Sequence, residues 1–567
     1  MAPVRANRPL SRVHINAQRS GSSVRFGSPS IVDPVHAYGE PDYRISPLDG
    51  TAYASGPWGT GTQRSVWNRS TDGGRTFLAM HNPPIQSSSE SATTIAGPGG
   101  GDTEISIDNT GKVYYADLAA LASLKMATWE NSRCEDGCPS DTLQTQTIAN
   151  PPQNINGYDR QWFALWDPED PQAVRDATGY TGPFPVNYLL FAEALAGTSC
   201  ASGSCESASY STDGLTYSDS TMSYDMQNDG PLVIEQSTGT VIEGISVDSL
   251  NDVGVAILTR DPANPDDPAL KNSRIVKVAD LPGDMTDRAL FPVPALDNAG
   301  NLYLVWVTRS DQLSKDNPKA WQIWYAWSKK SSNWTDWSRP IKLSSAPSNT
   351  NVMPWATAGA NGRLAVVWYG TDDQSHNPST EGAHQEWNVY LNVVTNAAST
   401  SPNLHQQRVT RHPMHYGTVC LEGTGCIAVQ GNRNLADFFE VTTDPRTGQI
   451  VIVYDDTSND ITQTVANGQQ VGDSAADHKG APIVTVALQN GGVGLLGRTI
   501  HGAPRGGTKM RDRKDDAAWD PIYGADNVPQ LDLRNAKIKR MKKSFRIKLK
   551  VGQLSDFSTA LGTTGSA

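Results

Sequence analysis

The sequence has no uninterrupted run of about 18 apolar residues, the length that a membrane-spanning helix requires. We therefore expect no membrane span. Long amphipathic helical patterns are also scarce, whereas turn-forming and aromatic residues are abundant. The 567 residues include 50 glycines, 36 prolines, 15 tryptophans and 18 tyrosines. This combination favours an all-β protein built from short strands.

Cysteine is rare, with six residues in the chain. Short disulfide staples in Gly- and Ser-rich loops are typical of oxidising compartments, so we expect three disulfides and a secreted, extracellular protein. Six free thiols or a metal site are the alternatives, and the lack of a CxxC pair with nearby histidines speaks against zinc. The N-terminal MAPVRANRPL has no apolar signal region, so we take Met1 as a mature start. The expected disulfides join Cys134 to Cys138, Cys200 to Cys205 and Cys420 to Cys426.

Positive charge is scarce in most of the chain, which has a formal net charge of -12. An acidic body argues against nucleic acid as the main partner. The exception is residues 501–550, which carry 14 Lys and Arg against 6 Asp and Glu. A solvated strand face explains this basic segment better than a polyanion site does.

One short motif organises the rest of the sequence. Residues Ser70–Phe77 have the pattern Ser-x-Asp-x-Gly-x-Thr-aromatic. The pattern predicts a tight hairpin turn, because its glycines allow positive φ and its Ser and Asp side chains can accept or donate hydrogen bonds within the turn. A version one residue shorter recurs at Ser211–Tyr217, and a degenerate one ends at Trp334.

Strand-rich units recur along the chain and begin near residues 40, 102, 159, 229, 290, 352 and 433. Repeated units about 60–80 residues apart predict a β-propeller, with seven blades preferred and six as the alternative, because the fourth unit has the weakest pattern. A strand near residues 23–31 could close the ring by joining the last blade. We expect an N-terminal segment at 1–38, the propeller at 39–495, a linker at 496–530 and a short C-terminal β appendage at 531–567, either a hairpin or an incomplete sandwich.

Charged residues gather where the units begin. The starts of the innermost strands of a propeller meet at one mouth of its axis, so these side chains should converge. Paired carboxyl groups suit glycoside hydrolysis, and arginine forks and tryptophan faces suit sugar binding. We expect catalytic roles for Glu40, Asp102 and Asp159, and substrate binding by Arg44, Arg160, Trp162, Asp229, Trp355, Arg433, Asn434 and Asp437.

Two other interpretations of these acids stay open. Oxygen-rich clusters suit Ca²⁺, so an axial calcium is the second, and no other cofactor is expected. The third is purely structural, with each acid bonding turn amides. His415 and Tyr416 could supply a base and an acid at the rim, although a surface loop is the simpler account. The pairs Asp455–Asp456 and Asp515–Asp516 are expected to be solvated.

The turn motif, the repeated units and the phrases PDYRI, GGDTEISID, DRQWFAL, MPWATAG and GNRNLADFFEV resemble secreted bacterial proteins of the sialidase-like, BNR-repeat (Asp-box) superfamily over residues 25–495. The resemblance implies a propeller. The superfamily includes sialidases, other glycosidases, lyases and non-catalytic binders. Tyr43-Arg44-Ile45-Ser46 is similar to a motif whose arginine binds the sialate carboxylate, but Ser46 stands where the family has proline. Arg160 and Arg433 are further arginines by position, and a Tyr–Glu nucleophile pair is not assignable.

The sequence therefore predicts a secreted, carbohydrate-active enzyme, a sialidase-like glycoside hydrolase acting on an extracellular glycan at the axial mouth. The alternative is a non-catalytic glycan- or protein-binding propeller, with or without axial calcium. The oligomeric state is not predictable from these patterns.

Overall fold

The computed structural model of the chain describes residues 24–57, 65–79, 100–119, 123–129, 143–148, 158–193, 205–225, 228–247, 251–283, 285–286, 290–380, 385–423, 426, 432–459, 463–464, 470–471, 480–501, 509–511, 533–540 and 545–551. Met1–Leu78 with Pro84–Ile500 form one compact unit, and Ala79–Pro83 with His501–Ala567 form a second.

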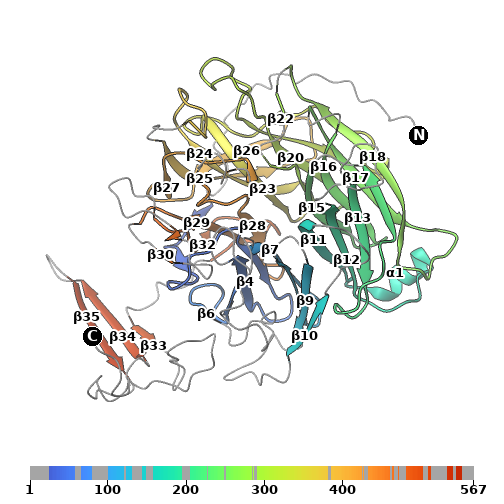
Figure 1. Cartoon of the computed structure of the whole chain (residues 1–567), viewed down its shortest axis with the longest axis horizontal. Helices are drawn as coiled ribbons and strands as arrows, with labels where there is room; N and C mark the ends of the chain where they lie inside the picture. Colours follow the sequence, from blue (N-terminus) through green and yellow to red (C-terminus); the bar gives the residue numbers. More distant parts are fainter. Residues whose placement is uncertain are drawn as a thin grey trace. The chain divides into compact units, whose positions relative to one another are not determined.

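The first unit is a seven-bladed β-propeller, so the six-bladed alternative is wrong (Figure 1). The described residues form seven antiparallel sheets of four main strands. Blade 1 is β3 (Asp42–Ile45), β4 (Ala52–Pro57), β5 (Ser65–Ser70) and β6 (Leu78–Ala79). Blade 2 is β7 (Gly100–Ile107), β8 (Val113–Ala119), β9 (Ser123–Trp129) and β10 (Leu143–Ile148). Blade 3 is β11 (Tyr158–Trp166), β12 (Val186–Glu193), β13 (Cys205–Ser211) and β14 (Met222–Asp225).

The remaining blades repeat this order. Blade 4 is β15 (Asp229–Glu235), β16 (Thr240–Val247), β17 (Asp252–Arg260) and β18 (Leu270–Asp280). Blade 5 is β19 (Val293–Leu296), β20 (Leu302–Val307), β21 (Ile323–Ser328) and β22 (Ile341–Lys342). Blade 6 is β23 (Thr350–Ala358), β24 (Arg363–Thr371), β25 (Glu386–Thr395) and β26 (Asn403–Arg408), with β27 (His415–Tyr416) also on β25. Blade 7 contains β28 (Glu440–Thr443), β29 (Ile450–Asp456) and β32 (Ile483–Gly491).

An N-terminal strand completes blade 7 and closes the ring, as the sequence suggested. In β1 (Arg25–Phe26), Phe26 pairs with Gln489 of β32. In β2 (Ser30–Ile31), Ser30 pairs with Val486 of the same strand. The chain thereby covers the outer edge of its last sheet, which would otherwise present unpaired backbone groups.

The seven inner strands line one axis. Each of β3, β7, β11, β15, β19 and β23 packs against the inner strand of the next blade, and β28 packs against β3. The second strands of the blades lie between neighbouring sheets and are buried on both faces, as in Leu302–Val307, whose six residues read LYLVWV. This two-sided burial explains why those strands are continuous apolar runs without a polar alternation.

The predicted turn at Ser70–Phe77 connects the third and fourth strands of blade 1 and has the expected hydrogen bonds. The backbone N–H groups of Arg75 and Thr76 each donate to Asp72 Oδ1 at 2.9 Å, and Gly74 N donates to Ser70 Oγ at 2.8 Å. Phe77 packs edge-to-face on Tyr43, with ring centroids 6.2 Å apart. The shorter turn repeats these contacts, with Leu215 N and Thr216 N donating to Asp213 Oδ1.

Asp72→Ala should lower the free energy of unfolding by about 1–2 kcal/mol, because two turn amides and the Thr76 hydroxyl lose a charged acceptor. The midpoint of urea unfolding measures this loss. Asp336→Ala is the matched control, since Asp336 is exposed in the degenerate turn near Trp334 and should change stability by less than about 0.5 kcal/mol. Equal effects of the two substitutions would show that the turn hydrogen bonds contribute nothing specific.

The other elements lie outside the blades. Helix α1 (Pro171–Thr178) lies between β11 and β12, η2 (Lys330–Ser332) follows β21, and β30 (Gln463–Thr464) pairs with β31 (Gln470–Val471). No helix in the described part of the chain has the length and apolar character to cross a membrane.

The second unit contains a three-stranded sheet of β33 (Lys509–Arg511), β34 (Leu533–Arg540) and β35 (Phe545–Val551). The two strands expected from the sequence pair with each other, and β33 is a third strand from the segment expected to be a linker. Leu549, which alternates with Lys548 and Lys550 in β35, is 59% exposed.

Candidate functional site

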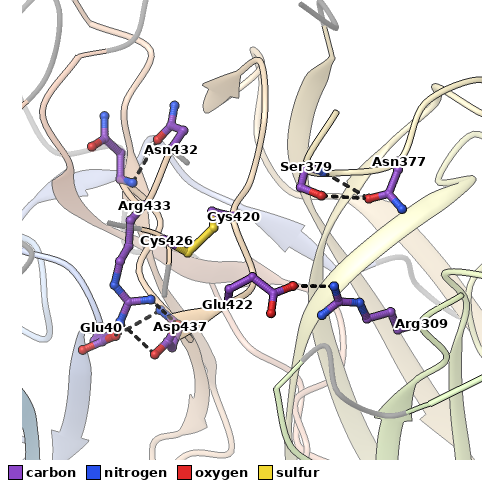
Figure 2. The surroundings of a disulfide bond; sticks show 11 residues. Glu40, Arg309, Asn377, Ser379, Cys420, Glu422, Cys426, Asn432, Arg433 and Asp437 are labelled. Carbon is purple, nitrogen blue, oxygen red and sulfur yellow. Dashed lines mark hydrogen bonds and ion pairs between the residues drawn. A yellow bond between two sulfur atoms is a disulfide. The ribbon is translucent and has the colours of Figure 1, made fainter. Parts of the chain in front are cut away.

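Two arginines meet at the mouth where the inner strands begin, as the sequence predicts. Arg433 forms a bidentate ion pair with Asp437, with Nη1–Oδ1 at 2.5 Å and Nη2–Oδ2 at 2.9 Å (Figure 2). Glu40 of blade 1 contacts both residues of this pair. Its Oε1 accepts hydrogen bonds from the backbone N–H of Asp437 at 3.1 Å and from Arg433 Nη2 at 3.5 Å. Arg160 from β11 reaches Asp437 Oδ2 at 4.0 Å. We call Glu40, Arg160, Arg433 and Asp437 the mouth cluster.

β-Bulges aim these side chains. The pairing of β11 with β12 shifts register between Asp159 and Trp162, and that of β23 with β24 shifts between Val352 and Trp355. Arg160 lies within the first bulge at φ 53°. A bulge leaves extra residues unpaired and turns their side chains, which explains how adjacent positions of one strand reach both the mouth and the axis.

The two arginines determine the charge state of Asp437. Burial alone would raise the pKa of this carboxyl, but Arg433 and then Arg160 outweigh burial and hold its pKa below the usual value. Asp437 is therefore an ionised carboxylate at neutral pH. The guanidinium of Arg160 also lies 4.9 Å from the ring centre of Phe291.

A disulfide-bonded loop flanks the mouth cluster. Cys420 and Cys426 form the predicted disulfide, and Cys420 N donates to the carbonyl of Asn432, next to Arg433 (Figure 2). Glu422 in this loop pairs with Arg309 of blade 5. The disulfide therefore fixes a loop that is hydrogen-bonded to Asn432, the residue before Arg433, and ion-paired with blade 5.

The other two expected disulfides are not confirmed as pairs. Cys205 is disulfide-bonded, but its expected partner Cys200 lies outside the described residues. Cys134 lies outside the described residues, and so does Cys138. The disulfide between Cys134 and Cys138 therefore stays a prediction from the sequence.

Four aromatic rings fill the axis below the mouth cluster. They are Trp162, Phe291, Trp355 and Phe438, and every pair of ring centroids lies between 5.4 and 6.2 Å apart. Trp162 is 2% and Trp355 6% exposed. Both rings pack on the other rings of this aromatic cluster, and their expected stacking on a sugar stays a prediction.

A cavity of about 350 Å³ lies along the later halves of the inner strands, on the side of the aromatic cluster away from the mouth. Trp162 and Trp355 contribute to its apolar wall, and Arg44 and Glu104 supply charge. The hydroxyl-bearing residues in its wall are Ser106, Thr357 and Thr442. We call this the axial cavity. It combines apolar walls with a few polar groups, as ligand pockets do.

Arg44 binds three carboxyl groups from three blades. Its Nη1 donates to Glu440 Oε2 at 2.6 Å, its Nη2 donates to Glu104 Oε1 at 2.7 Å, and Nη1 also contacts Asp42 Oδ1. Asp42 and Glu440 are fully or almost fully buried, and the Arg44 side chain is 26% exposed. We call these four residues the Arg44 cluster.

Burial is the main influence on the acids of the Arg44 cluster. It raises the pKa of Glu104 well above the usual value, and repulsion from Asp42 adds to this, while Arg44 opposes it. Burial also raises the pKa of Asp42 and of Glu440, again against the pull of Arg44. One guanidinium cannot neutralise three carboxylates, so burial and mutual repulsion favour the protonated form of part of the cluster.

The remaining nominated residues differ in their surroundings. Asp102 and Asp229 are buried, at 9% and 5% exposure. Asn434 turns to the last blade, where its side chain donates to Gly480 O at 3.1 Å. Asp159 belongs to β11, but its side chain lies outside the described residues.

Sequence reasoning misses Glu440 and is wrong at two other positions. Glu440 opens β28 as Asp42 opens β3, and this repetition is a usable signal. Asp455, expected in solvent, is completely buried, and neither of its carboxyl oxygens has a hydrogen bond among the described residues. Burial is the main cause that raises its pKa, and repulsion from Glu40 is the second. His415, expected on a surface loop, is buried and bonded to Thr457 Oγ1 at 2.7 Å. Asp515–Asp516 lie outside the described residues.

Within the described ranges, no group of three or more His, Cys, Asp or Glu residues has an arrangement that could hold a metal ion. The acids of the mouth and Arg44 clusters instead face guanidinium groups.

No family model and no curated protein matches the chain. Solved structures share its architecture distantly. The phage phi92 endosialidase is 10% identical, with 94% of this chain and 76% of that chain covered and a TM-score of 0.42. An α-L-arabinanase from Penicillium chrysogenum is 10% identical, with 83% of this chain and 98% of that chain covered and a TM-score of 0.36. The BP39L lectin from Burkholderia pseudomallei is 10% identical, with 77% of this chain and 98% of that chain covered and a TM-score of 0.41.

Proposed function

We propose that the protein is secreted and carbohydrate-active, and that it hydrolyses an extracellular glycan with one sugar unit in the axial cavity and Glu104 as general acid. One observation carries the proposal: Glu104 is a cavity-facing carboxyl group whose pKa is raised by burial. A carboxyl group beside a pocket, with a pKa raised by burial, is suited to protonate a leaving-group oxygen. The Cys420–Cys426 disulfide supports secretion.

Hydrolysis of the usual kind needs a second carboxyl group, about 5–9.5 Å from the first. Glu440 is one candidate, because it binds the same guanidinium as Glu104. Asp102, Asp159 and Glu40, nominated from the sequence, remain the others.

Non-catalytic glycan binding is the second candidate function. Among the described residues that line the axial cavity, Glu104 alone carries a carboxyl group. Glu40 is occupied with Arg433 and a backbone amide, which is a structural use of the group. A propeller with this wall could hold a sugar without cleaving it.

Glu104→Gln should reduce the release of reducing ends from a responsive glycan by roughly 10²–10⁴-fold, because a glutamine cannot donate the proton. Glycan affinity should change much less. Wild-type activity should fall as pH rises through the raised pKa of Glu104, since the acid form is then lost. The measurement is a reducing-end assay across a panel of extracellular glycans.

Asp266→Asn, on an exposed loop of blade 4, is the control and should retain full activity. Parallel Glu440→Gln and Asp159→Asn variants identify the second carboxyl group. If the Glu104→Gln protein released reducing ends as fast as the wild-type protein does, Glu104 would not be the general acid. Binding without release by the wild type would favour the second candidate function.

A further inference from the structure

Arginine is the usual protein ligand for the carboxylate or sulfate of an acidic sugar, because its fork matches two oxygens at once. Such recognition requires terminal N–H groups that are not already committed to the protein. Among the described residues, three arginines lie at the axis and its mouth, namely Arg44, Arg160 and Arg433, and their existing partners determine which sugars the site can accept.

Arg44 is the guanidinium that faces the axial cavity, and protein groups occupy both of its terminal nitrogens. Nη1 donates to Glu440 at 2.6 Å and to the Tyr43 carbonyl at 3.0 Å. Nη2 donates to Glu104 at 2.7 Å. An incoming carboxylate would have to displace carboxyl groups that the fold itself holds in place.

The arginines at the mouth are committed in the same way. Figure 2 shows the fork of Arg433 directed at Asp437, with Glu40 beside it. Arg160 donates to Asn228 Oδ1 at 3.0 Å, lies 4.0 Å from Asp437 and rests over the Phe291 ring. Neither fork is directed at open space.

The charge balance points in the same direction. The three guanidinium groups face five carboxyl groups, which are Glu40, Asp42, Glu104, Asp437 and Glu440. A further anion would add to a surplus of acids. In the cavity wall, the hydroxyl groups of Ser106, Thr357 and Thr442 offer donors and acceptors for sugar hydroxyls.

We infer that the axial cavity takes a neutral sugar unit and excludes sugars that carry a carboxylate or sulfate. This inference rests on the proposed function, because it specifies the substrate class of the same site. It also separates this chain from the sialate chemistry that the Tyr43–Ser46 motif suggested.

The test is a glycan array printed in matched pairs at about 0.15 M NaCl, where exposed charges are screened within roughly 8 Å. Each pair is a neutral oligosaccharide and the same oligosaccharide with one terminal uronate, sialate or sulfate. At least one neutral member should bind, and its acidic partner should bind at least tenfold more weakly. Glu440→Gln should reduce the preference for the neutral over the acidic member of each pair, because it removes a carboxylate from Arg44. Asp266→Asn should leave this preference unchanged. Urea unfolding midpoints verify that each variant is folded.

The outcomes separate the inference from the function beneath it. Suppose that the acidic member of a pair binds as tightly as the neutral member or more tightly, and that Glu104→Gln weakens this binding. This result would overturn the neutral-sugar inference and would leave the proposed function standing. Binding of no member of any pair would overturn the proposed function, and the inference with it. A ratio that Glu440→Gln does not change would also count against the assigned role of the Arg44 cluster.

Discussion

Arg44→Met should lower the free energy of unfolding by about 3–5 kcal/mol at pH 8 and by much less at pH 4.5. The variant removes the guanidinium that binds Asp42, Glu104 and Glu440 and leaves buried carboxyl groups without a counter-charge. Methionine preserves much of the side-chain length, so lost packing contributes little. Urea unfolding at a series of pH values measures the difference.

The sign of the pH effect follows from the raised pKa values of the three acids. A carboxyl whose folded-state pKa is raised contributes stability that is fully present below its unfolded pKa, about 4, and is lost as pH rises through the folded pKa. Arg44 limits that loss, because it lowers the pKa of all three acids against the effect of burial. Without Arg44 their pKa values rise further, and stability falls more steeply above pH 4.

The control for this variant is Arg274→Met on the exposed outer strand of blade 4. Arg274 donates to the carbonyl of Asn333 and has an exposed side chain, so its removal should cost less than about 0.5 kcal/mol at either pH. A loss for Arg44→Met that is the same at pH 4.5 and pH 8 would mean that Arg44 acts through packing and not through charge.

The architecture could be predicted because a similar local sequence pattern of strands and turns repeats from blade to blade. A short inner strand followed by a strand buried on both faces recurs in each unit, most units have a glycine turn between these two strands, and seven such units give seven sheets. Even the ring closure was readable, since a strand-like segment precedes the first unit. The strand β33 was not readable, because three residues in a polar segment carry no periodic pattern.

The candidate site was predictable as a neighbourhood but not in its contacts. Glu40, Arg160, Arg433 and Asp437 converge because strand starts converge. The sequence cannot show which carboxyl groups occupy each arginine, nor that Trp162 and Trp355 pack into one cluster. Such pairings depend on register and bulges, which single residues of one strand do not reveal.

Asp455 illustrates the same limit from the opposite side. The segment YDDTSND reads as polar and therefore solvated, yet Asp455 lies near the end of β29 and points into the protein, near Glu40. Its neighbour Asp456 pairs with the exposed His412, as a surface residue does. Alternation along the strand separates the two acids, and composition alone treats them as equivalent.

Trp162→Ala should lower the free energy of unfolding by about 3–5 kcal/mol, comparable to the loss of Arg44, because it empties the centre of the aromatic cluster. The Trp162 ring lies 5.4 Å from Phe291, 5.6 Å from Phe438 and 6.0 Å from Trp355, so one substitution removes contacts to three inner-strand regions. Urea unfolding midpoints give the loss, and the near-ultraviolet circular dichroism of the coupled rings should weaken with it.

Trp162→Phe is the matched variant, and it should cost about 1–2 kcal/mol because a smaller ring keeps part of the packing. The cluster contacts the mouth through Phe291 under Arg160 and the axial cavity through Trp162 and Trp355. A loss below about 1 kcal/mol for Trp162→Ala would mean that the rings are not a structural plug of the axis. In that case their faces would again be candidates for sugar stacking, and the axial site would extend from the cavity to the mouth.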